Sequence, residues 1–231
     1  MRLLLSLIFF SFQLIAPLSP FASETSQQLI IEHGPRGSSK IALTFDACPT
    51  GKLDEYDEKV IDVLLKESVP ATLFMSGRWV EKNPEKTKLL ASRPQFEIGQ
   101  HSYYHPHMLE KDDERVLREL KRTQMLIKKI TGRTPQYFRP PFGEVDERIV
   151  RLAAGAGLIT IQYDIASGDP DPDLSPQRIV RSVLRDAKGG SIIVFHMNGN
   201  GVHTADILPQ IISGLRQKGF TLVTIGDLLK K

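Results

Sequence analysis

The feature that most constrains the fold is a regular alternation of short apolar runs with longer amphipathic segments. Seven runs have the length and composition of buried strands, at residues 41–45, 71–75, 96–99, 137–139, 158–163, 191–196 and 220–225. Between them lie helical patterns, the clearest at residues 111–131, where apolar side chains recur on one side and Gly132 marks the end. This order predicts an α/β fold with a parallel sheet of about seven strands, closed or nearly closed into a barrel. Residues 29–32 are a candidate extra edge strand.

Two features of the sequence predict where helices start. Asn83 precedes Pro84 and Ser175 precedes Pro176, and each pair places a capping residue before a proline at the first helical position. We therefore expect helices to begin at both prolines.

The N-terminal residues differ from the rest of the chain. Arg2 is followed by an apolar run and then by small and polar residues around Ala22 and Ser23. This pattern predicts a signal peptide over residues 1–22, cut near Ala22, and hence export to the periplasm or the extracellular space. The alternative is an uncleaved anchor. After cleavage we expect an N-terminal segment at residues 23–38, one barrel domain at 39–231 and no stable membrane span.

Charge argues against a nucleic-acid-binding protein, and cysteine content excludes a fold stabilised by an intrachain disulfide. The formal net charge is only +3 and the basic residues are dispersed, which argues against a nucleic-acid partner. The single cysteine, Cys48, cannot form an intrachain disulfide, so the fold depends on its apolar core.

Polar residues with catalytic potential follow the expected strands. In parallel α/β barrels the chemistry lies at the carboxyl ends of the strands. Those ends carry Asp46, the pair His101 and His105, Arg139, the stretch 164–169, and His196. The two histidines stand four residues apart, a spacing that allows both imidazoles to bind one metal ion.

These strand ends resemble, in order, the motifs of the polysaccharide deacetylases, carbohydrate esterase family four with its NodB-homology domain. LTFDACPT at 43–50 is similar to the TFDDGP motif, HSYYH at 101–105 to H(S/T)xxH, and RPPFG at 139–143 to RxPYG. SGD at 167–169 stands where SxDW would end, and VFHMN at 194–198 corresponds to the LxH motif. The resemblance covers about residues 39–229. It implies a distorted (β/α) barrel that hydrolyses an N- or O-acetyl group on a sugar polymer with a divalent metal, zinc by preference.

The resemblance also implies roles for individual residues. Asp46 would be the general base, and Arg139 would keep it ionised. His196 would be the general acid, oriented by Asp169, with Asp164 as the rival for that role. The backbone N–H of Phe142 would bind the oxyanion. The metal would be held by His101 and His105.

One departure from the family concerns the metal. The second Asp of TFDDG, which supplies a carboxylate ligand, is Ala47 here. Three resolutions are open: a carboxylate from the following loop, Asp57 or else Asp54; the thiolate of Cys48; or no metal at all. We take Asp57 as the expected third ligand, because it would complete a two-His, one-carboxylate set. A role in capping the helix that follows is its competing interpretation.

Other departures concern the substrate. Phe142 replaces the tyrosine of RxPYG, and Pro170 replaces the tryptophan of the fourth motif. Trp79, the only tryptophan, is expected either to line the mouth of the site or to pack in the core. Three histidines have no place in the motifs and are expected to be non-catalytic: His33, His107 and His203.

Three functions follow from these observations. The leading one is an exported deacetylase acting on a cell-envelope or extracellular polysaccharide. The second is a glycan-binding protein that has lost catalysis with the metal ligand. The third is an amidohydrolase of the same fold that acts on a small cyclic amide.

Overall fold

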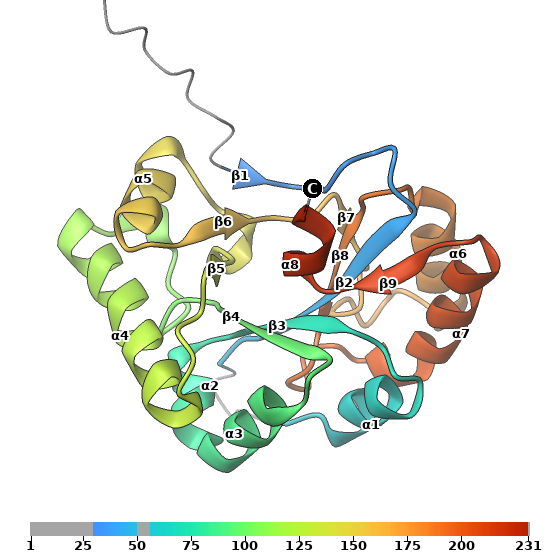
Figure 1. Cartoon of the computed structure of the whole chain (residues 1–231), viewed down its shortest axis with the longest axis horizontal. Coiled ribbons are helices and arrows are strands. Elements are labelled where there is room, and N and C mark those ends of the chain that lie inside the picture. Colours follow the sequence, from blue (N-terminus) through green and yellow to red (C-terminus); the bar gives the residue numbers. More distant parts are fainter. Residues whose placement is uncertain (1–29, 50–55, 231) are drawn as a thin grey trace, which may run out of the picture.

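In the computed structural model, which describes residues 30–49 and 56–230, the strands form one curled parallel sheet (Figure 1). Its order is β1-β6-β5-β4-β3-β2-β8-β7, with β9 paired to the start of β2. All the pairings between these strands are parallel. The strands are β1 (Ile30–Ile31), β2 (Lys40–Ala47), β3 (Ala71–Met75), β4 (Phe96–Gln100), β5 (Tyr137–Phe138), β6 (Ile159–Ile161), β7 (Ile165–Ala166), β8 (Ile192–His196) and β9 (Thr221–Val223).

The α-helices follow the strands in alternation, and most of them lie on the outer side of the sheet in Figure 1. They are α1 (Glu58–Lys66), α2 (Gly77–Lys82), α3 (Pro84–Ser92), α4 (Asp113–Thr131), α5 (Glu147–Gly155), α6 (Pro176–Asp186), α7 (Thr204–Gln217) and α8 (Ile225–Leu229). Two single-turn 3₁₀ helices, η1 (Met108–Glu110) and η2 (Pro141–Gly143), lie in the loops after β4 and β5. The predicted parallel α/β barrel is confirmed.

The sheet does not close completely. The chain passes from β6 to β7 through residues 162–164, which brings the two ends of the strand order near each other. His33, just after β1, forms an antiparallel bridge with Ser191, next to β8. The result is a distorted barrel with a seam between β1 and β7.

Most expected elements are present, with boundary changes that have local causes. Helices α3 and α6 begin at Pro84 and Pro176 as predicted. Helix α4 ends at Gly132, whose φ of +73° is the left-handed conformation that glycine adopts easily. The expected strand at 158–163 is the shorter β6, Ile159–Ile161, and β7 at Ile165–Ala166 was not expected.

The last expected strand, 220–225, is too long. It ends at Val223, because the Thr224 hydroxyl accepts a hydrogen bond from the N–H of Asp227 and caps α8. Helix α8 then closes one end of the barrel. The N–H of Ile225 donates to the Thr72 hydroxyl, near the start of β3, and Ile225 and Leu228 pack on the inner face of the sheet. The opposite end, where the strands finish, stays open for the site.

Candidate active site

The carboxyl ends of β2, β7 and β8 and the loops after β4, β5 and β6 enclose a cavity of about 320 Å³. Asp46 and His196 face it from neighbouring strands, and their Cα atoms are partners in the β2–β8 register. His101, His105 and Cys48 line the same cavity. These five residues are therefore brought to one place, although they come from segments up to 150 residues apart.

Asp46 and Arg139 form an ion pair beneath the cavity. The guanidinium Nη1 donates to Asp46 Oδ1 at 2.8 Å, and Nη2 donates to the carbonyl of Gln162 at 3.3 Å. Both side chains are buried. Burial raises the pKa of Asp46, but the charges of Arg139, His101 and His196 outweigh it and hold that pKa below its usual value. The pair keeps a carboxylate ionised at the floor of the site.

His101 is oriented by a backbone carbonyl. Its Nδ1 donates to the carbonyl oxygen of Arg139 at 2.8 Å, because a carbonyl can only accept. Nε2 is thereby turned toward the cavity, 3.8 Å from Asp46 Oδ2. A neutral imidazole held in this way has a free Nε2 lone pair for a metal.

The loop that carries both histidines is fixed from below by helix α4. One carboxylate oxygen of the buried Glu119 accepts from the N–H groups of Tyr103 and Tyr104, at 2.8 and 2.7 Å. The hydroxyl of Ser102 accepts from the N–H of His105 at 3.1 Å. His105 has a φ of +58°, a conformation a bulky residue holds only when its surroundings impose it. These bonds place the second imidazole beside the first.

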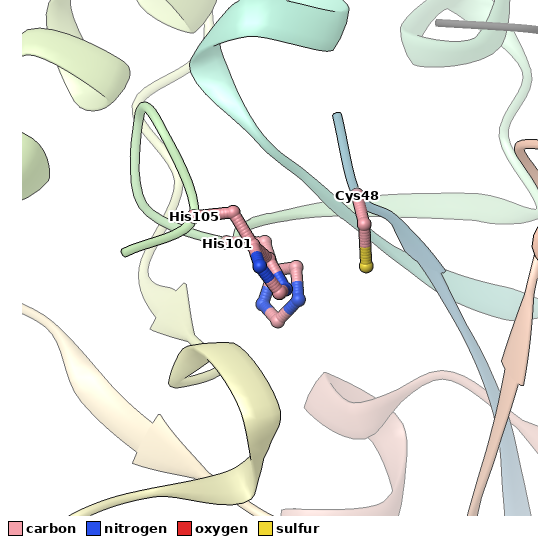
Figure 2. Close-up of side chains that lie close together, drawn as sticks. All are labelled: Cys48, His101 and His105. Atoms are coloured by element: carbon pink, nitrogen blue, oxygen red, sulfur yellow. The ribbon is translucent and has the colours of Figure 1, made fainter. Parts of the chain in front are cut away.

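Three side chains could hold a metal ion among the residues the structure describes: Cys48, His101 and His105. One ligand atom from each lies within 4.8 Å of the others. Figure 2 shows the two imidazoles close together, from the loop after β4, with the Cys48 side chain entering from the end of β2. The donor set of one sulfur and two imidazole nitrogens suits a borderline-soft divalent metal.

The expected third ligand, Asp57, has another partner in the structure, and its role as a metal ligand stays a prediction. Asp57 is the N-cap of α1, and its carboxylate accepts from the N–H of Val60 at 3.2 Å. That bond satisfies an N–H of the first helical turn. Asp57 is not in the group of three side chains that could hold a metal ion, which has Cys48 beside the two histidines. Asp54, the other acidic candidate, lies outside the described residues.

His196 is held by Asp169. The Nδ1 of His196 donates to Asp169 Oδ1 at 3.0 Å, and the backbone N–H of His196 donates to Oδ2 at 2.8 Å. The hydroxyls of Ser167 and Thr204 also donate to this buried carboxylate. Burial lowers the pKa of His196, but the bond to Asp169 and the neighbouring Cys48 outweigh it and hold that pKa well above its usual value.

The rival residue Asp164 has a different position. Its carboxylate accepts from the hydroxyl of Ser191 and the N–H of Ile192, and it pairs with Arg36 at 2.8 Å. Asp164 therefore joins the segment before β2 to the start of β8, while Asp169 holds the imidazole.

Phe142 stands at the mouth of the cavity, half exposed, with a φ of +59°. Its ring stacks on His107, with centroids 4.1 Å apart and an interplanar angle of 8°. Its edge contact with His105 has a centroid distance of 4.4 Å. Trp79, in contrast, is completely buried beside Tyr56, so its packing interpretation is correct and the alternative at the mouth is wrong.

Cys48 was named from the sequence as one candidate ligand, although not the preferred one. It stands two positions after Asp46, and strand alternation places such residues on one face. Other residues of the site were not predicted. Ser167 stands in the SGD motif, two residues before the carboxylate it binds. His107 was set aside as non-catalytic but supports the ring of Phe142. Tyr163, in the cavity wall, had no signal beyond its position after a strand.

The electrostatics of the cavity are strongly coupled. Burial raises the pKa of the Cys48 thiol, but the imidazoles of His101, His105 and His196 outweigh burial and hold that pKa well below its usual value. Burial lowers the pKa of His101, and the negative charges of Asp46 and Cys48 outweigh it in the opposite direction. The cavity thus stabilises a thiolate between imidazoles.

Known proteins match this chain in sequence and in fold. The family profile named polysaccharide deacetylase matches residues 33–161. A peptidoglycan-N-acetylglucosamine deacetylase from Bacillus cereus is 30% identical over 199 residues, which are 85% of this chain and 91% of that protein. A crystal structure of a peptidoglycan N-acetylglucosamine deacetylase in complex with 4-naphthalen-1-yl-N-oxidanyl-benzamide has a TM-score of 0.80 at 28% identity, covering 87% of this chain and 92% of that one.

A family 4 carbohydrate esterase described as a pseudoenzyme, from Bacillus anthracis, has a similar fold. Its TM-score is 0.78 at 26% identity, covering 87% of this chain and 69% of that one. The fold thus occurs both in proteins named as deacetylases and in a protein named as a pseudoenzyme.

Proposed function

The chain belongs to the polysaccharide deacetylase family, and from that premise we propose that it is a metal-dependent hydrolase that removes acetyl groups from an N-acetylated polysaccharide of the peptidoglycan type. One observation carries the proposal. Asp46 and His196 face one cavity from paired positions on β2 and β8. They have opposite electrostatic support, Asp46 from a guanidinium and His196 from a carboxylate. A base and an acid with different environments are what amide hydrolysis at neutral pH requires.

Each residue has a defined task in this proposal. Asp46, kept ionised by Arg139, accepts the proton of the attacking water. His196, kept protonated by Asp169, donates a proton to the departing amine. The backbone N–H of Phe142 donates to the developing oxyanion. A divalent metal at His101 and His105 supplies Lewis-acid polarisation and, for zinc, lowers the pKa of water to about 7.

The relatives guide the choice of substrate. Proteins named as deacetylases of peptidoglycan N-acetylglucosamine and of peptidoglycan N-acetylmuramic acid match most of this chain. The exposed ring of Phe142 beside the cavity offers an apolar face on which a sugar ring can stack. A polymer with N-acetylated amino sugars is therefore the first substrate to test.

Export is part of the proposal. The signal peptide predicted at residues 1–22 lies outside the described residues, and in the part of the chain that is described no helix has the length and apolarity to cross a membrane. Intact-mass measurement of protein from the cell envelope tests export. A mass that begins near Ser23 is expected, and a mass that includes Met1 would contradict cleavage.

Two observations favour a second function, glycan binding without hydrolysis. Ala47 stands where the family motif has a ligating carboxylate, and a related fold is named as a pseudoenzyme. A protein of this kind would bind the glycan in the same cavity without hydrolysing it.

Acetate release separates the two functions. The mature protein, loaded with zinc, is incubated with N-acetylated chitooligosaccharides and with peptidoglycan fragments, and free acetate and free amines are measured. Release that disappears in Asp46→Asn supports the deacetylase. Binding of the same oligosaccharides, seen by calorimetry without any acetate, supports the glycan-binding protein.

A further inference from the structure

We propose that the thiolate of Cys48 replaces the missing carboxylate as the third protein ligand, so that this chain binds a thiol-preferring metal such as zinc or cobalt rather than magnesium, calcium or manganese. The inference deepens the proposed function and depends on its assumption that a metal occupies the cavity. It concerns how this chain, with Ala47, completes its metal site.

The direction of the Cys48 side chain follows from strand geometry. Side chains alternate along β2, so Asp46 and Cys48 face the same side and both line the cavity. Ala47 points the other way, completely buried in the core between the sheet and the outer helices. The residue that replaces the motif carboxylate is therefore turned away, and the residue after it takes its place.

Three hydrogen bonds fix the backbone at the end of β2. The carbonyl of Asp46 accepts from the N–H of Met197 at 3.0 Å, and the carbonyl of Ala47 accepts from the N–H of Ser76 at 3.1 Å. The carbonyl of Cys48 accepts from the side-chain amide of the buried Asn198. The strand end is thus tied to the segments after β8 and β3, which holds the Cβ of Cys48 in one direction.

The histidines are directed at the same point. His101 has Nε2 free for a ligand bond because Nδ1 is committed to a carbonyl. The ring centroids of His101 and His105 lie 4.8 Å apart, with the rings edge to face. In a tetrahedral zinc site the ligand atoms lie roughly 3.3–3.6 Å apart, given bonds of about 2.0 Å to nitrogen and 2.3 Å to sulfur. A spread of 4.8 Å closes to that size by about 1 Å of side-chain movement.

The ligand set has a consequence for metal choice. Magnesium, calcium and manganese prefer oxygen ligands, whereas a thiolate with two imidazoles favours zinc and its substitute cobalt. Three protein ligands also leave one tetrahedral position open for water, the pattern of catalytic zinc sites.

Cobalt titration without substrate tests the inference independently of activity. Wild-type protein should bind Co²⁺ with a sulfur-to-cobalt charge-transfer absorption in the near ultraviolet. Cys48→Ser should lose that absorption and bind zinc at least roughly a hundredfold more weakly. Cys48→Asp offers oxygen at the same position, so it should recover metal binding without the absorption and with a shift of preference toward manganese.

Asp57→Asn is the matched control. Asparagine caps a helix as well as aspartate does but cannot supply a carboxylate ligand, so this variant should keep both the absorption and the affinity. Fluorescence of the single buried Trp79 reports whether each variant is folded.

Two results would overturn the inference. Wild-type protein that binds cobalt without the charge-transfer absorption, and with an affinity equal to that of Cys48→Ser, would remove the thiolate from the site while leaving a metal-dependent deacetylase possible. Wild-type protein that binds no cobalt or zinc would overturn the inference outright, and acetate release measured separately would then decide the function.

Discussion

Replacing Arg139 with methionine tests whether this buried guanidinium keeps Asp46 ionised. Arg139 is completely buried, its Nη1 lies 2.8 Å from Asp46 Oδ1, and its guanidinium carbon lies 4.1 Å from the centroid of the Phe74 ring. Methionine fills a similar apolar space without charge. The variant therefore removes the partner of a carboxylate that stays buried.

The expected loss follows from the cost of an uncompensated buried charge. Removing one partner of such a pair costs about 3–5 kcal/mol of unfolding free energy near pH 7. Burial is the largest influence on the pKa of Asp46, and it raises that pKa. Without the guanidinium, burial is no longer outweighed, so we expect the pKa of Asp46 to rise.

The contribution of Asp46 to stability depends on pH with opposite sign in the wild type and in Arg139→Met. In the wild type the pKa of Asp46 is lowered, so its contribution to stability is present above the unfolded pKa and is lost as the pH falls through the folded pKa. In Arg139→Met the pKa is raised, so the variant loses stability as the pH rises through the range between the unfolded and the folded value. The stability difference between them should be largest at neutral pH and should shrink toward pH 4.

The assay is urea denaturation between pH 4 and pH 7, followed by the fluorescence of Trp79. Arg151→Met is the control, because Arg151 forms an exposed pair with Glu147 at 2.6 Å, and such pairs contribute less than about 1 kcal/mol. The acid limb of the kcat/KM profile should also move to higher pH in Arg139→Met. An equal loss of stability at pH 4 and pH 7 would show that Arg139 acts by packing, and would refute the electrostatic argument.

Three further predictions address the remaining residues of the site. Asp46→Asn should fold and bind metal but turn over roughly a hundredfold or more slowly, the size of a general-base contribution; turnover at the wild-type rate would exclude that role. Asp169→Asn removes the carboxylate that raises the pKa of His196, so the alkaline limb of the rate profile should move to lower pH, and an unchanged limb would contradict the pairing. In the wild type the stability from protonated His196 is complete below pH 6.5 and is lost as the pH rises through the raised folded pKa. Asp57→Ala should cost about 1 kcal/mol by urea denaturation, as loss of an N-cap does, with zinc affinity unchanged; a large drop in affinity would restore Asp57 as a ligand.

The sequence by itself determined the class of fold and the approximate place of the site. Strand and helix patterns are local, because side-chain periodicity and capping residues act within a few positions of the chain. Parallel strands also end at one edge, so Asp46, His101, Arg139 and His196 could be assigned to one region before any contact was known. The ends of strands and helices were less certain. The strand expected to run to residue 225 ends at Val223, because Thr224 caps α8.

Only the tertiary structure decided which candidate side chains point toward that site. Asp57 and Cys48 were both candidates by residue type, and their difference lies in direction: the carboxylate turns to its own helix, and the thiol turns to two imidazoles. Asp164 and Asp169 were likewise separated by their partners, Ser191 for one and His196 for the other. Such directions depend on hydrogen bonds between residues far apart in the chain, like the one from Asn198 that fixes the carbonyl of Cys48. Local sequence patterns do not contain them, because the folded backbone brings these partners together.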